Sequence, residues 1–157
     1  MQDDRERNAV QRGGFDPHTV FERILAGDLP ATVIHRDELV AAFLDIQPIT
    51  PGHTLVVPLV KAASLAELPA ATGARMFSVA QRIAAALRVT ELRCEGVNLF
   101  LADGAVAGQT VFHLHLHVFP RYQDDGFRWK LPENYYSPPP RIEIEAVGAR
   151  IRQALDG

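Results

Sequence analysis

The sequence has little cysteine, no long hydrophobic run and no large excess of either charge. Its one cysteine, Cys94, excludes an intramolecular disulfide and any cysteine-rich zinc site. No apolar run approaches the roughly 20 residues that span a bilayer, so no transmembrane helix is predicted. A formal net charge of −3 argues against a general nucleic-acid-binding or membrane surface. With 47% hydrophobic and 22% charged residues, the composition is typical of a soluble globular protein, which we expect to be cytoplasmic.

The length of 157 residues suits one domain with an additional segment at each end. Residues 1–14 are expected to form a flexible tail, because they contain few side chains that could form a core. The main domain is predicted to cover residues 15–122. Residues 123–157 are predicted to form a C-terminal extension, a loop followed by a helix, that packs on the domain or on a dimer partner.

Helical and strand patterns predict an α+β fold with a mainly antiparallel sheet. A short helix is predicted from Asp16, a good N-cap, to Gly27, a good helix end, with an apolar stripe of Val20, Phe21, Ile24 and Leu25. A longer helix is predicted within 65–88, with one apolar face formed by Leu68, Met76, Val79, Ile83 and Leu87, and an amphipathic helix closes the chain over 141–155. Strands are predicted in a hairpin over 31–46 and at 53–59, 96–103 and 110–120, with Pro120 ending the last one.

The stretch "HLHLH" over residues 113–117 alternates histidine with leucine. In a strand, alternate side chains share one face of the sheet. His113, His115 and His117 would then form a line on one face. Phe112, Leu114, Leu116 and Val118 would pack beneath the helices. Buried imidazoles need hydrogen-bond partners, so three on one face are costly to place by chance. A core strand with satisfied histidines is the least demanding interpretation, but a metal site and a catalytic site fit the pattern better.

The metal interpretation is limited by the length of a strand. At about 3.3 Å per residue, the first and third histidines are roughly 13 Å apart at the backbone. Zinc–nitrogen bonds are about 2.0–2.1 Å, so one flat strand cannot wrap all three around one ion. Two neighbours could bind an ion together with a third ligand such as His53 or His35.

The catalytic interpretation uses the middle histidine as a nucleophile. A neutral imidazole is nucleophilic near neutral pH when its far nitrogen is held by a hydrogen bond. His115 has a further histidine on each side that could bind ligand or stabilise charge. The glycine loop "DGAVAGQT" precedes it directly. There, Gly108 would allow close backbone approach to a phosphate, while Gln109 and Thr110 could donate hydrogen bonds to phosphoryl oxygens.

Two long segments resemble the histidine triad family of nucleotide hydrolases and transferases. They are "FERILAGDLPATVIHRDELVAAFLDIQPITPGHTLVVP" and "GVNLFLADGAVAGQTVFHLHLHVFPRY", and the resemblance covers about 18–122. It implies a five-stranded antiparallel sheet with two main helices, here followed by the C-terminal helix, in a homodimer with a continuous ten-stranded sheet. It also implies hydrolysis of diadenosine polyphosphates or adenosine phosphoramidates at the α-phosphate. The product is a nucleoside monophosphate, released from a covalent nucleotidyl–histidine intermediate.

The same resemblance implies roles for individual residues. His115 would be the nucleophile, with His113 and His117 contacting the phosphate or the leaving group and Gln109 near the scissile bridge. His53 would complete the histidine cluster from a neighbouring strand. The residues implied in nucleoside binding are Ile24, Phe43 and Ile46 around the base and Asp45 at the ribose hydroxyls.

The chain departs from the family pattern at two places. Thr19 and Glu22 stand where many bacterial members have a Cys-x-x-Cys zinc motif, so we expect no structural zinc and no required cofactor, although a divalent metal could accompany the substrate. Ala102 stands where a polar side chain often contacts the phosphate or leaving group. That loss motivates an alternative, a nucleotide-binding module without activity. His117 is retained where transferases commonly have Gln, which favours hydrolysis.

Overall fold

A computed structural model describes residues 15–157, so the predicted tail over 1–14 lies outside the described residues. The chain divides into two compact units, of which the first ends at Asp125 and the second covers Gly126–Gly157. The boundaries predicted at 15–122 and 123–157 stay predictions.

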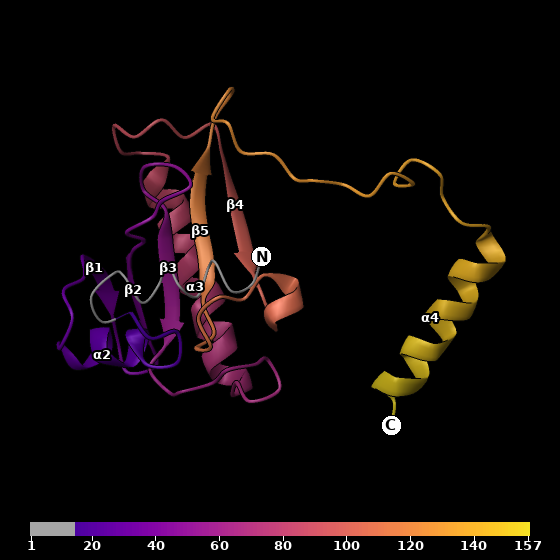
Figure 1. Cartoon of the computed structure of the whole chain (residues 1–157), viewed down its shortest axis with the longest axis horizontal. Helices are drawn as coiled ribbons and strands as arrows, with labels where there is room; N and C mark the ends of the chain where they lie inside the picture. The colour runs from indigo at the N-terminus through magenta and orange to yellow at the C-terminus, as the bar shows by residue number, and fades with distance from the viewer. Residues whose placement is uncertain (1–14) are drawn as a thin grey trace. The chain divides into compact units, whose positions relative to one another are not determined.

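The first unit is built on a five-stranded antiparallel sheet in the order β1-β2-β3-β5-β4 (Figure 1). The strands are β1 Val33–Arg36, β2 Val40–Leu44, β3 Thr54–Pro58, β4 Gly96–Leu101 and β5 Leu116–Arg121. The predicted α+β class and the predicted antiparallel sheet are confirmed. The turn between β1 and β2 is closed by Asp37, whose Oδ1 accepts from the N–H groups of Leu39 and Val40.

The α-helices of residues 15–157 are α2 Val20–Ala26 and α3 Ala70–Leu87 in the first unit, and α4 Arg141–Leu155 in the second. Helix α2 begins later than predicted, because residues 17–19 form a turn. Asp16 still organises that start, since its carboxylate accepts from His18 N and Thr19 Oγ1 and its carbonyl accepts from Val20 N. Gly27 ends α2 as predicted, with a φ of 87°.

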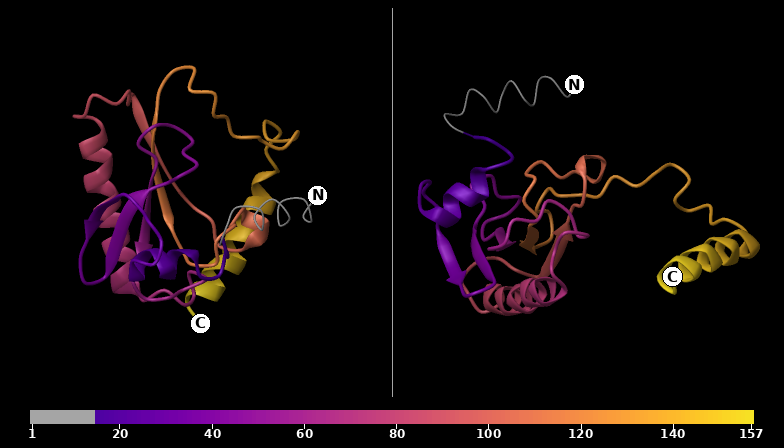
Figure 2. Two further views of the ribbon diagram at one scale, coloured as in Figure 1. Left: turned by 60° about the vertical axis from the view of Figure 1, so that its left-hand side comes forward. Right: turned by 90° about the horizontal axis from the view of Figure 1, so that it is seen from below.

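The two faces of the sheet carry separate cores, one beneath each helix. Val40, Ala42 and Val56 turn toward α3 and pack with Met76, Val79, Ile83 and Leu87, most of the predicted helix face. Their strand neighbours Ala41, Phe43, Leu55 and Val57 turn the other way and pack with Val20 and Phe21 of α2. Figures 1 and 2 show α3 lying along its face of the sheet. The residues on the α2 face also carry the candidate site.

The histidine stretch is only partly a strand, which corrects the prediction for 110–120. β5 begins at Leu116, while residues 110–115 are irregular. In that segment Phe112 N–H donates to Pro17 O and Leu114 N–H to Ala62 O, so the backbone bonds to loops instead of strands. Phe112 was predicted to pack beneath the helices, but its ring stacks on His18 at 4.9 Å between centroids.

Pro120 lies inside β5, opposite Val97, whereas it was predicted to end the strand. In an antiparallel strand, the N and C=O groups of one residue point toward the same neighbouring strand. The Pro120 carbonyl points toward the β3 side and accepts from Thr50 Oγ1 at 2.6 Å. The pairing of β5 with β3 reaches only to Thr54, opposite Val118, so the N–H that proline lacks removes no hydrogen bond between these strands.

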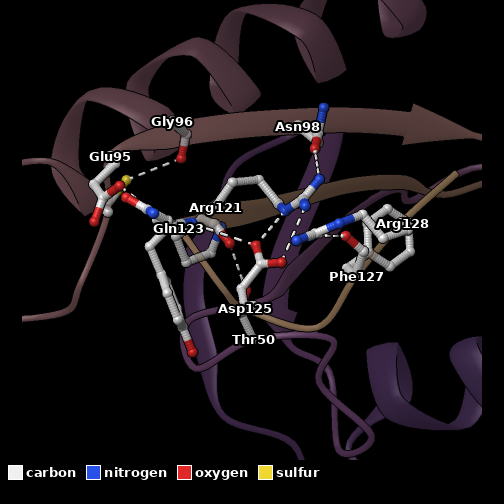
Figure 3. Close-up of polar contacts among 12 residues, drawn as sticks. Thr50, Glu95, Gly96, Asn98, Arg121, Gln123, Asp125, Phe127 and Arg128 are labelled. Atoms are coloured by element: carbon white, nitrogen blue, oxygen red, sulfur yellow. Dashed lines mark hydrogen bonds and ion pairs between the residues drawn. The ribbon is translucent and has the colours of Figure 1, made fainter.

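A polar cluster closes the first unit at the far end of β5 (Figure 3). The Arg121 guanidinium binds the Asp125 carboxylate, with Nη2 at 3.0 Å from Oδ1, and its Nη1 donates to Asn98 Oδ1 on β4 at 2.6 Å. The Gln123 N–H donates to Glu95 Oε2. The side chain of Asp125 is fully buried, so this pairing holds the end of β5 to β4.

The second unit contains α4, none of whose residues is buried. Its exposed apolar side chains are Ile142, Ile144, Val147, Ile151 and Leu155. Packing of this extension on the domain or on a dimer partner stays a prediction. Over residues 15–157, no helix has the length and apolar character required to cross a bilayer.

Candidate active site

Four imidazoles gather on the α2 face of the sheet. His117 lies on β5, His53 immediately precedes β3, and His113 and His115 lie in the irregular segment before β5. Ring centroids are 4.7 Å apart for His115 and His117 and 5.1 Å apart for His53 and His117. The predicted row of histidines is therefore a cluster, which the fourth histidine joins from the neighbouring strand.

His115 is oriented by the backbone of its own segment. Its Nδ1 lies 2.8 Å from the carbonyl oxygen of His113. A carbonyl can only accept, so Nδ1 carries the proton and Nε2 presents a lone pair. The ring is only 5% exposed, and burial lowers the pKa of His115 below that of a free imidazole. The arrangement holds a neutral, oriented imidazole at neutral pH, with the Nε2 lone pair free of protein hydrogen bonds among the described residues.

His53 and His117 form a hydrogen-bonded pair, and a backbone N–H that donates to His53 determines the tautomers of both rings. The amide of Ile49 donates to His53 Nδ1 at 3.1 Å, so in the neutral ring Nε2 carries the proton. His53 Nε2 lies 2.9 Å from His117 Nδ1 and donates to it, which places the proton of His117 on Nε2. Burial lowers the pKa of His53, and burial together with the neighbouring His115 and His53 lowers the pKa of His117 to about 3.

His113 has its ring turned into the protein. Its Nε2 donates to the Pro58 carbonyl at 2.8 Å, and the side chain is 1% exposed. Its Nδ1 is buried and has no hydrogen-bond partner among the described residues. Burial lowers the pKa of His113, so the ring is neutral at neutral pH. A phosphate contact for this ring stays a prediction; its carbonyl is what orients His115.

Asp45, His53 and His117 form the group in the described chain that could hold a metal ion, with ligand atoms within 4.8 Å of one another. The Ile49 N–H weighs against a metal here. An ion on His53 Nδ1 would displace that donor, and an ion on Nε2 would require a proton on Nδ1, facing the same N–H. The other predicted ligand, His35, bonds instead to Asp37 at 2.9 Å.

The residues predicted around the nucleoside lie partly together. Phe43 is buried on the α2 face, and Ile24 packs against the same cluster. Asp45 accepts from Gln47 N–H through Oδ1, and its Oδ2 lies 3.6 Å from His53 Nδ1. Ile46 is 89% exposed, so it is a surface residue at this edge of the site. The structure brings Asp45 to the histidine cluster, while its role at the ribose stays a prediction.

Phe21 is a site residue that the sequence interpretation treated only as part of the α2 core. Its ring meets His115 edge-on at 5.2 Å and His113 at 6.0 Å between centroids. It also meets Phe43 at 5.4 Å, so α2 presses directly on the two histidines of the irregular segment. The apolar stripe of α2 signalled its burial, but no sequence pattern indicated which rings it would contact.

The loop predicted to bind phosphate is built on a short 3-10 turn, Ala105–Ala107, between Gly104 and Gly108. Both glycines have positive φ angles, which favours glycine there. The Gly108 N–H donates to Ala105 O and the Gln109 N–H to Gly104 O. The N–H of Thr110 forms no hydrogen bond within the described part of the chain, so it is available to a ligand. Phosphate binding by Gly108, Gln109 and Thr110 stays a prediction.

The start of α2 does not suit the structural zinc ion that the family resemblance implies for many bacterial members. Thr19 Oγ1 donates to Asp16, and Glu22 is paired with the ammonium of Lys61 at 3.1 Å. Lys61 also donates to His18 O at 3.4 Å, so a cation already joins α2 to the segment after β3. A hydroxyl and a lysine-paired carboxylate are a poor replacement for two thiolates on zinc.

Comparison with known proteins agrees with this architecture. Residues 26–124 match the HIT domain. The chain is 40% identical over 139 residues to Protein hit of Bacillus subtilis, covering 87% of this chain and 93% of that protein. It is 34% identical over 116 residues to Adenylylsulfatase HINT3 of Arabidopsis thaliana, covering 74% of this chain and 58% of that protein. The crystal structure of a HIT family protein from Bacillus anthracis superposes with a TM-score of 0.78 at 34% identity, covering 86% of this chain and 95% of that protein. The chain therefore belongs to the HIT family, the histidine triad proteins.

Proposed function

We propose that this chain hydrolyses nucleoside phosphate derivatives at the α-phosphate through a covalent intermediate on His115. Membership of the HIT family and the relative named as an adenylylsulfatase support nucleotide hydrolase activity in general. The observation that carries the finer proposal is the hydrogen bond from His115 Nδ1 to the His113 carbonyl at 2.8 Å. It leaves the Nε2 lone pair of a neutral ring available for attack on phosphorus.

The proposed reaction has two displacements at the α-phosphorus. In the first, His115 Nε2 forms a bond to phosphorus, and the bond to the leaving group breaks with its electron pair on that group. His117 Nε2 donates a hydrogen bond to the leaving group, which takes its proton from solvent. In the second, water attacks phosphorus, the P–N bond breaks with its electron pair on Nε2, and the proton of the attacking water is released to solvent. The enzyme is regenerated and a nucleoside monophosphate is released.

The charges around the site favour particular substrates. The Asp45 carboxylate raises the pKa of His53 and His115, while Glu22 and Lys61 act in opposite directions on the pKa of His113. A phosphoramidate brings little charge beyond its α-phosphate. A dinucleoside polyphosphate brings several charges, so a divalent ion on the substrate would have to neutralise them. Polyphosphate hydrolysis is therefore expected to need Mg²⁺ and phosphoramidate hydrolysis is not.

A substrate panel tests the proposal. It contains diadenosine polyphosphates, adenosine phosphoramidates and adenylyl sulfate, each assayed with Mg²⁺ and with EDTA, with release of AMP as the readout. We expect AMP from at least one class, and Mg²⁺ dependence confined to the polyphosphates. Tight AMP binding without turnover on any member would contradict the proposal.

A nucleotide-binding module without activity is the second candidate function, and Ala102 motivates it. This side chain is 4% exposed and offers no polar group where relatives often have one. The panel distinguishes the two candidates, because a binding module retains AMP and releases none from any substrate.

The homodimer implied by the family resemblance also stays a prediction. β4 is the last strand of the sheet and pairs on one side only among the described strands. An unpaired edge of this kind can pair with the same strand of a second copy, which would continue the sheet across a two-fold axis. Sedimentation of the full chain tests this.

A further inference from the structure

The side chain of Gln109 is buried, and its amide is fully engaged. It is 4% exposed. Its Oε1 accepts from the Gly104 N–H at 2.7 Å, and its Nε2 donates to the carbonyls of Ala63 at 2.8 Å and Val111 at 3.1 Å. Because one partner is a donor and two are acceptors, the orientation of the amide is unambiguous.

The three partners belong to three different segments. Gly104 lies in the loop after β4, Ala63 lies between β3 and α3, and Val111 lies in the irregular segment 110–115. Two further hydrogen bonds each join two of these segments: Leu114 N–H donates to Ala62 O, and Leu65 N–H donates to Asp103 Oδ2. Gln109 is the buried side chain that joins all three.

The histidine segment needs such support because it lacks a strand ladder before Leu116. A backbone without ladder hydrogen bonds must be held by side chains or loops. The position of this backbone matters for His115, since the carbonyl of His113 fixes its tautomer and its orientation. The available N–H of Thr110 directly follows Gln109, so its direction depends on the same backbone.

We propose that Gln109 is a positioning residue, a latch that holds the backbone of residues 110–115 so that His115 and the Thr110 N–H face the same phosphate. Its amide stays on its three protein partners and does not donate to the scissile bridge. The kinetic consequence rests on the proposed function. The latch itself is a property of the ligand-free protein and is measured without substrate.

The test removes the amide while keeping the volume, with Gln109→Met. In the ligand-free protein, we expect amide hydrogen exchange at Gly104 and Leu114 to accelerate at least tenfold. In rapid-quench assays at 25 °C, we expect the rate of His115 nucleotidylation to fall at least tenfold. The pH dependence of that rate should keep its shape, because a misplaced nucleophile loses alignment and not its pKa.

A second variant separates the two sides of the latch. Gln109→Glu keeps the acceptor for Gly104 but leaves the carbonyls of Ala63 and Val111 without a donor. Exchange should then accelerate at Leu114 while Gly104 stays protected. Gln81→Met makes the same change as the first variant at an exposed position on α3 and should alter neither exchange nor rate.

A direct substrate contact by Gln109 would give a different result. Both variants would then lose turnover while exchange in the ligand-free protein stayed within twofold of the original, and that outcome would overturn the latch. If the unsubstituted protein released no nucleotide from any substrate, the proposed function would fail on its own, and the exchange measurement would still decide the latch.

Discussion

The two halves of the "HLHLH" stretch are built differently although their sequence pattern is the same. His117 lies on β5, where strand pairing on both sides fixes its backbone. His113 and His115 lie before the strand, where a loop glutamine, the Pro58 carbonyl and the ring of Phe21 fix theirs. The half with less regular structure carries the proposed nucleophile. In the proposed reaction, the strand half supplies His117 and its hydrogen-bonded partner His53, and the irregular half supplies the orientation of attack.

The largest expected effect comes from the irregular half. His115→Ala removes the only atom proposed to bond to phosphorus, so turnover should fall about 10⁴-fold or more while AMP binding changes less than about tenfold. Steady-state release of AMP and calorimetric AMP binding check this. Turnover within tenfold of the unsubstituted protein would remove His115 from the mechanism.

A smaller loss is expected from the strand half. His53→Ala deletes the donor to His117 Nδ1, which leaves the His117 tautomer unset and lowers kcat by about 10- to 100-fold. Measured kcat on the best substrate of the panel checks this. His35→Ala is the matched control, because His35 lies on β1 and bonds to Asp37 at the turn between β1 and β2. Equal losses of kcat in both variants would contradict a specific role for His53.

The pH dependence of stability tests both halves together. Burial lowers the pKa of His53, His113, His115 and His117 in the folded protein, so the unfolded chain binds more protons below its imidazole pKa of about 6.5. The free energy of unfolding should therefore keep the full contribution of these neutral rings above pH 6.5, and it should decrease as the pH is lowered from 6.5 toward 3. Since the pKa of His117 is lowered to about 3, this residue alone should account for up to about 2 kcal/mol between pH 6.5 and 5.

Urea unfolding at these two pH values measures the loss, and His117→Gln should reduce it by the contribution of one proton. A variant with the original pH dependence would show that His117 is not the group that titrates. Asp37, whose pKa the hydrogen bond from His35 lowers most, acts in the same direction but only at lower pH.

The smallest expected effect is at the contact between α2 and the segment after β3. The Lys61–Glu22 pair occupies the place of a metal-bound motif, so EDTA should leave the melting temperature unchanged within about 1 °C. Both side chains are half-exposed, so Lys61→Ala should cost no more than about 1 kcal/mol. Thermal unfolding with and without chelator checks this. Stoichiometric zinc in the purified protein and a large loss of stability with EDTA would contradict it.

The sequence predicted the regular parts of the molecule well, because these follow hydrophobic periodicity. The face of α3 with Met76 and Ile83, the hairpin turn at Asp37 and the end of α2 at Gly27 all follow local rules. The start of β5 was missed because alternation of leucine and histidine satisfies a strand pattern whether or not a partner strand is available. The pairing of β5 ends at Leu116, opposite Val56 on β3 and Leu101 on β4, and local sequence does not encode that limit.

The gathering of the four histidines was predicted, but their internal contacts were not. The family resemblance brought His53 to the cluster, but only tertiary structure places the Ile49 N–H on its ring. Likewise, Gln109 was expected near the scissile bridge, while its burial against Ala63 and Val111 depends on loops distant in sequence. Tautomers and buried polar pairings depend on the whole fold, so the residue pattern alone cannot determine them.

Trapping the covalent intermediate is the most direct test of the central claim. The protein is mixed with its best substrate, quenched within milliseconds and digested, and the peptide containing residues 113–117 is analysed by mass spectrometry. We predict a mass increase of one nucleoside monophosphate residue on His115 that disappears in His115→Ala. Full turnover with no adduct on this peptide, or an adduct on His113 or His117 instead, would contradict the account.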